Sequence, residues 1–147
     1  MIVTTRKDIA LEKLSGGYNC AQSVLFAFCP DLGLDRERAL RLMTGFGAGM
    51  ARRQEVCGAL SGAIAAIGLA HGRGEGQGKD ATDAAYAKVR DLMARFEERR
   101  GSCLCRVLMG CDLSTPEGRA AAKERHLSAT VCRACVATAA EIADDLI

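Results

Sequence analysis

Apolar and polar positions along this chain alternate mostly at helical spacing. Apolar side chains recur every three or four residues through most of the sequence, and no alternating strand pattern is longer than a few residues. Alanine is abundant and runs of β-branched residues are scarce, so local propensity also favours helix. The sequence therefore predicts an all-α protein, a helical bundle of about five to seven helices in a single domain over residues 1–147.

Capping and helix-breaking residues indicate where the helices begin and end. Asn19 and Asp35 are favourable N-caps, and Pro30 ends the helix that Asn19 starts. Ser114 is expected to cap a helix that has Pro116 in its first turn. The expected helices cover about 5–15, 19–29, 35–43, 55–72, 80–99 and 114–126, with a short turn-helix-turn over 101–113 and a final helix that runs to about 146.

The segment 55–72, EVCGALSGAIAAIGLAHG, carries small residues at four-residue spacing. Glycine inside a helix costs about 1 kcal/mol relative to alanine, so Gly58, Gly62 and Gly68 together would cost about 3 kcal/mol. Small residues let two helix backbones approach closely. We therefore expect this helix to be the packing centre of the bundle, with Cys57 in its first turns.

Composition and charge exclude several classes of partner. The formal net charge is only +2 and aromatic residues make up 4% of the chain, so neither an electrostatic footprint nor stacking platforms for nucleic acid are present. The longest apolar run, 56–70, is shorter than the about 20 residues of a membrane span. No secretory signal is visible at the N-terminus. These features predict a cytoplasmic protein with no nucleic-acid partner and no membrane span.

The glycine-rich stretches 45–49 and 72–78 do not indicate nucleotide binding. Each contains a GxGxG pattern. A dinucleotide fingerprint requires a preceding strand within a βαβ unit, and neither stretch has one. Both stretches are expected to be turns and linkers.

Cysteine is the most informative residue type in the chain. In a reducing cytosol a high cysteine count more often indicates metal binding or thiol chemistry than structural disulfides. The alternative is that several cysteines are small buried hydrophobes. The eight cysteines are Cys20, Cys29, Cys57, Cys103, Cys105, Cys111, Cys132 and Cys135.

Four cysteines are expected in the first turns of helices, where free N–H groups and a partial positive charge lower the pKa of a thiol. Ser102 could cap the helix at Cys103, and Ser128 or Thr130 the last helix. Nearby arginines would stabilise thiolates further. The four cysteines are Cys20, Cys57, Cys103 and Cys132, and the arginines are Arg52, Arg53, Arg106 and Arg133.

Cysteine spacing also allows a metal site. Cys132 and Cys135 form a CxxC motif, and both sulfurs lie on one face of the expected helix. Cys103, Cys105 and Cys111 gather in one short turn-helix-turn. Together the two groups could complete a four-sulfur site. Four thiolates hold either zinc or an iron–sulfur cluster, and the spacing leaves both open.

The sequence resembles the C-GCAxxG-C-C family, small proteins to which a redox role is ascribed from their separated cysteines. Four segments carry the resemblance: GYNCAQSVL, CGALSGA, GSCLCRVLMGCDL and VCRACVATAAEI. The family label writes Gly-Cys-Ala, whereas this chain reads Cys-Gly-Ala from position 57. The resemblance implies a redox role and identifies the family's four cysteines as Cys20, Cys57, Cys105 and Cys132. Beyond that set stand Cys29, Cys103, Cys111 and Cys135.

Two hypotheses follow. In the first, Cys20, Cys57, Cys105 and Cys132 from separate helices form one site, either as redox thiols serving an unidentified redox partner or as ligands of an iron–sulfur cluster or zinc. Cys103, Cys111 and Cys135 could extend the metal version. In the second, the chain is a non-catalytic helical interaction module, a homodimer, whose cysteines are mostly structural. An enzyme with a single cysteine nucleophile is disfavoured because neither His71 nor His126 is a convincing partner.

Overall fold

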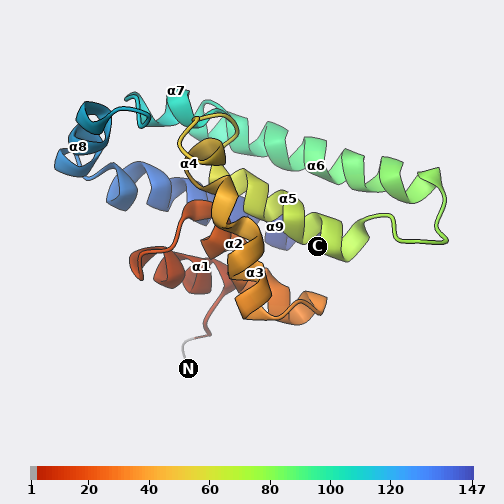
Figure 1. The fold of residues 1–147 in the computed structure, drawn as a ribbon. Helices are drawn as coiled ribbons and strands as arrows, with labels where there is room; N and C mark the ends of the chain where they lie inside the picture. Colours follow the sequence, from red (N-terminus) through yellow and green to blue (C-terminus); the bar gives the residue numbers. More distant parts are fainter. Residues whose placement is uncertain (1–2) are drawn as a thin grey trace.

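The computed structural model describes residues 3–147 as helices joined by short turns (Figure 1). Within that range the strand-like pairing is limited to one bridge between Val56 and Leu104, and no helix is both long and apolar enough to cross a bilayer. The all-α class is confirmed. The helices are α1 (Arg6–Ser15), α2 (Cys20–Phe28), α3 (Arg36–Met43), α4 (Gly47–Met50), α5 (Gly58–His71), α6 (Lys79–Arg100), α7 (Cys105–Met109), α8 (Pro116–Glu124) and α9 (Arg133–Leu146).

More helices form in residues 3–147 than the five to seven predicted, and the one without a counterpart among the expected segments is the short α4, in a stretch expected to be a turn. Gly110, in a left-handed conformation, ends the short α7, and Pro116 begins α8. Helices α7 and α8 lie at one end of the bundle, and most of the long α6 and α9 extends away from them (Figure 1). The chain thereby brings the 101–113 segment back against the beginning of α5.

Helix α5 packs against α2, α6 and α9, and its residues 58–63 are all buried. A Cβ atom on Gly62 would lie 2.6 Å from the carbonyl oxygen of Ala21, and one on Gly58 would lie 3.2 Å from that of Phe46. Both glycines therefore permit close helix approach. Gly68 does not, because it is exposed and nothing lies within 4 Å of the position of its Cβ. The packing role predicted for that residue is wrong.

Two predicted N-caps are confirmed. Asn19 caps α2 by accepting a hydrogen bond from the Gln22 amide, and the Gln22 side chain accepts one from the Asn19 amide. Asp35 caps α3 through the amide of Arg38. Cys20 therefore occupies the first position of α2, as the sequence predicts.

The other predicted caps are wrong. Thr115 rather than Ser114 caps α8, since Ser114 donates instead to Asp112. Ser102 accepts from the Leu104 amide, and α7 begins at Cys105 rather than around Cys103. Neither Ser128 nor Thr130 caps the last helix, because both belong to a π-helical turn, η3 (Ser128–Cys132), that continues directly into α9. Cys132 therefore lies inside a continuous helix and not at a free N-terminus.

The expected connection after α3 contains a left-handed turn. The 3-10 turn η2 (Thr44–Phe46) leads into α4, where φ is positive at Ala48 and Gly49 and remains positive at Met50, Ala51 and Arg52. Left-handed backbone costs about 1–2 kcal/mol for each residue other than glycine. The surrounding structure must therefore stabilise this turn.

Gln54 provides much of that stabilisation. Its buried side chain donates to the Cys111 carbonyl over 2.7 Å and accepts from the Leu113 amide over 2.9 Å. Main-chain bonds join the same segments: the Cys105 amide donates to the Glu55 carbonyl, and the Cys57 amide to that of Cys103. Residues 48–57 and 103–113 are thus bound together, and the beginning of α5 is fixed beside the beginning of α7.

Candidate thiol site

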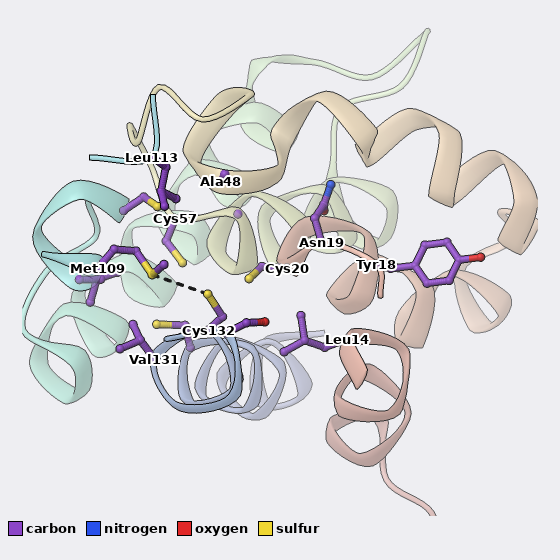
Figure 2. Close-up of a pocket in the computed structure, with 15 residues that line it drawn as sticks. Leu14, Tyr18, Asn19, Cys20, Ala48, Cys57, Met109, Leu113, Val131 and Cys132 are labelled. Atoms are coloured by element: carbon purple, nitrogen blue, oxygen red, sulfur yellow. Dashed lines mark hydrogen bonds between the residues drawn. The ribbon is translucent and has the colours of Figure 1, made fainter. Parts of the chain in front are cut away.

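Five cysteines line one cavity of about 170 Å³ between α2, α5, α7 and α9. Most other wall residues are apolar, including Leu108, Met109, Leu113 and Val131. An apolar cavity of roughly 150 Å³ is large enough for benzene, so this one has room for a small ligand. Figure 2 shows Cys57, Cys20 and Cys132 extending into the space between the helices. The five are Cys20, Cys57, Cys105, Cys132 and Cys135.

Three of these cysteines lie where helices begin. Cys20 is the first residue of α2, Cys57 is the N-cap residue of α5, and Cys105 is the first residue of α7. The last two, Cys132 and Cys135, follow one another along η3 and α9, so that a single helix supplies the CxxC motif. The wider π-helical turn ends at Cys132, the kind of irregularity often found at functional sites.

Cys20 and Cys132 form the first thiol pair of the cavity. A hydrogen bond from Cys20 lowers the pKa of Cys132, although burial opposes this effect. The same interaction, together with burial, raises the pKa of Cys20 well above its ordinary value. In its neutral form the Cys132 thiol donates to the Met109 sulfur, 3.7 Å away (Figure 2). Cys132 is therefore the member of the pair that loses its proton first.

Cys57 and Cys135 form the second thiol pair. A hydrogen bond from Cys135 is the main cause that lowers the pKa of Cys57, and the backbone N–H groups of Ala59 and Leu60 add to it. Burial acts in the opposite direction. The pKa of Cys135 is raised, by its interaction with Cys57 and then by burial. The start of α5 thus favours a thiolate at Cys57.

Cys105 completes the sulfur lining as a neutral thiol. Burial raises its pKa to about 12, and the charge on Cys57 contributes to the increase. At neutral pH the thiol keeps its proton. Cys105 therefore differs from Cys57 and Cys132, whose pKa values are lowered.

The remaining three cysteines lie outside the cavity. Cys29 is buried in the main core and donates to the Phe26 carbonyl, while Cys103 donates to the Met93 carbonyl from a partly exposed position. Cys111 is partly exposed and packs against a small group of buried residues, Cys105, Met109, Leu113 and Leu127. Of the cysteines that could extend the predicted metal site, the structure brings only Cys135 to the other four.

All eight cysteines are free thiols. Across residues 3–147, no group of three or more histidine, cysteine or acidic side chains has an arrangement that could hold a metal ion. The predicted zinc or iron–sulfur ligation therefore stays a prediction. The CxxC motif was the one sequence signal for Cys135, whereas nothing in the local sequence indicated that Met109 or Gln54 would support the site.

Comparison with known families agrees with this arrangement. A family model described as "Putative redox-active protein (C_GCAxxG_C_C)" matches residues 18–146. The chain belongs to this family. The matched range includes all eight cysteines, so family membership does not by itself separate the cavity thiols from Cys29, Cys103 and Cys111. Comparisons with curated proteins and with solved structures find no match.

Proposed function

We propose that the chain is a thiol–disulfide redox protein whose cavity carries two reactive dithiols, Cys20–Cys132 and Cys57–Cys135. One observation carries the proposal: each pair combines a thiol of lowered pKa with a thiol of raised pKa, and both pairs line the same cavity. A thiolate beside a protonated thiol is the arrangement that disulfide exchange requires. Membership in a family described as redox-active supports the same conclusion.

Cys132 is the nucleophile in the first step. It is partly exposed, whereas only 5% of Cys57 is accessible. Its thiolate attacks one sulfur of a substrate disulfide, RS–SR′, so that a mixed disulfide to R′S forms and RS⁻ leaves and takes up a proton. The Cys20 thiol then gives up its proton and attacks the Cys132 sulfur. The products are two substrate thiols and a Cys20–Cys132 disulfide, and the protein has lost two electrons.

The second pair receives the disulfide by exchange within the cavity. Cys135 lies one helical turn beyond Cys132, so the two sulfurs are neighbours. Attack of Cys135 on Cys132 releases Cys20, and attack of Cys57 on Cys135 releases Cys132. The first dithiol is then reduced again, and the disulfide joins Cys57 to Cys135. In this scheme Cys105 remains protonated and contributes to the wall of the cavity.

Two other functions remain as alternatives. The four cysteines that the family resemblance identifies, Cys20, Cys57, Cys105 and Cys132, could instead hold an iron–sulfur cluster or zinc, which would fix all four as thiolates. The chain could also be a helical interaction module, with its cysteines serving only to fill space. The arrangement of four cavity cysteines in two pairs favours the dithiol function over the metal site and over the interaction module.

The decisive experiment measures thiols and metal in protein purified without oxygen. The reduced protein is titrated with oxidised glutathione, free thiols are counted, and disulfides are mapped by mass spectrometry. We expect two disulfides, Cys20–Cys132 and Cys57–Cys135. A Cys132→Ser variant should form neither bond, because the second pair is oxidised through Cys132. Cys111→Ser, a control in a partly exposed thiol outside the cavity, should form both.

Three results would overturn the dithiol proposal. Stoichiometric iron with a visible absorption band would establish a cluster, and one bound zinc in colourless protein would establish a zinc site. Thiols that never change on mild oxidation, in protein free of metal, would favour the interaction module. The interaction module would be supported further if replacing Cys20, Cys57, Cys105 and Cys132 by alanine left the fold unchanged.

A further inference from the structure

A second hollow, of about 540 Å³, is formed by the two segments that position Cys57 and Cys105, together with Ser114 and with Arg119 of α8. Unlike the cysteine cavity, it is open and largely polar. Its wall contains four guanidinium groups and only two carboxylates, which leaves an excess of two positive charges. The charged residues are Arg52, Arg53, Arg106 and Arg119, with Glu55 and Asp112; Ala51 and Ser114 complete the wall.

Two of the arginines are held in place by the main chain. The Nε atom of Arg106 donates to the Gln54 carbonyl over 3.1 Å, and its Nη2 atom contacts Glu55 at 2.9 Å. The Nη1 atom of Arg119 donates to the Leu113 carbonyl over 3.0 Å. Each guanidinium carries five N–H groups, so donors remain on both after these bonds. Little conformational freedom would be lost when a ligand binds to them.

The other two arginines bring charge that the hollow does not neutralise. Arg52 follows the left-handed turn with φ of 69° and, among the ion pairs of residues 3–147, has none. Arg53 approaches Glu55 only at 3.9 Å, and Glu55 already pairs with Arg106. Like charges gathered in one hollow repel each other, and an anion bound between them would remove that repulsion.

We propose that this hollow is a binding site for a phosphate group. A phosphate carries about −1.5 to −2 charges at neutral pH, which matches the excess of two positive charges in the wall. The planar guanidinium fork pairs with two phosphate oxygens at once. Free phosphate and the phosphoryl group of a small molecule present this same chemistry. The site is separate from the proposed thiol chemistry, since no step of the exchange requires it.

The test is a titration of the ¹⁵N-labelled, reduced protein with inorganic phosphate, followed by amide chemical shifts at constant ionic strength. We expect saturable shifts confined to residues 51–55, 106, 112–114 and 119. An Arg52→Gln, Arg119→Gln double variant should bind at least about tenfold more weakly, since it loses two charge-assisted contacts. Arg90→Gln, at an exposed position on α6 outside the hollow, is the matched control and should bind as the wild type does.

The proposal is wrong if the shifts do not saturate, if they spread over arginines elsewhere on the surface, or if the double variant keeps the wild-type affinity. Tighter binding of succinate than of phosphate would also overturn it. A second titration, with glycerol phosphate, distinguishes free phosphate from the phosphoryl group of a small molecule as the ligand. Tighter binding of the ester supports a phosphorylated small molecule, and equal or weaker binding supports free phosphate.

Discussion

Cys57 and Cys135 form a thiol pair, although one precedes the central helix α5 and the other lies in the last helix, α9. The pair is directional. Cys135 holds its proton and stabilises negative charge on Cys57, where the first amides of α5 assist. The reactivity of one cysteine therefore depends on the thiol of the other, which makes the pair open to test by substitution.

Replacing Cys135 by alanine should raise the pKa of Cys57. The substitution removes the hydrogen bond that is the main cause of the lowered value, while burial, which acts in the opposite direction, remains. The measurement is the rate of alkylation of Cys57 by iodoacetamide from about pH 6 to 11, resolved by peptide mass spectrometry. The midpoint should move to higher pH. Cys29→Ala, a change outside the cavity, should leave it in place, and an unmoved midpoint in Cys135→Ala would contradict the pairing.

Removing the Cys105 thiol should change how stability depends on pH. The folded protein holds this proton more tightly than the unfolded chain, because the pKa rises from 9.0 to about 12 on folding. The stability contributed by the neutral thiol is therefore complete below pH 9.0 and is lost as the pH rises toward about 12. In urea unfolding across this range, the free energy of unfolding of Cys105→Ala should fall less steeply with pH than that of the wild type. The difference in slope should correspond to up to about one bound proton. An unchanged slope would show that Cys105 ionises as easily in the folded state.

Two glycines of α5 should respond oppositely to alanine. Gly62→Ala places a methyl group 2.6 Å from the Ala21 carbonyl oxygen, so α2 and α5 must separate, at a cost of about 1–3 kcal/mol. Gly68→Ala meets no atom within 4 Å and should stabilise the protein by about 0.5–1 kcal/mol through helix propensity. Thermal and urea unfolding measure both. Equal effects of the two changes would be inconsistent with close packing at Gly62.

Gln54→Ala should destabilise the protein by about 2–4 kcal/mol. The change leaves the buried Leu113 amide and the partly buried Cys111 carbonyl without their partner. A buried unsatisfied group costs about 1–3 kcal/mol, and the carbonyl should cost less because water can reach it. Gln77→Ala is the control, because Gln77 also hydrogen-bonds the main chain, at Gly74, but in an exposed loop. Urea unfolding should separate the two variants. If Gln54→Ala were as mild as the control, the 48–57 and 103–113 segments would be joined by their main chains alone.

Local signals in the sequence predicted much of the fold and part of the site. Asn19 indicated the start of α2 and therefore the position of Cys20, and the small residues of 58–63 indicated the central helix. The partner of Cys57 could not be predicted in this way. It depends on how α5 and α9 cross, and that geometry is set by the packing of the whole bundle rather than by the residues beside either cysteine.

The left-handed turn after η2 was not predictable for a related reason. Alanine, methionine and arginine avoid positive φ, so within residues 48–52 only Gly49 favours it. The turn exists because distant groups, chiefly the Cys111 carbonyl and the Leu113 amide, hold Gln54 beside it. The sequence-based expectation of a glycine-rich turn and linker therefore missed the feature that fixes Cys57 beside Cys105.

The left-handed turn also has a consequence for chirality. At Ala48 and Ala51 the backbone angles are those that a mirror-image amino acid prefers. A chain assembled chemically with D-alanine at these two positions would keep the natural backbone and be relieved of strain there. The same replacement at Ala63, inside the right-handed α5, would break the helix. Handedness is thus specified residue by residue in this protein, and the run of five consecutive left-handed residues, 48–52, lies beside its reactive sulfurs.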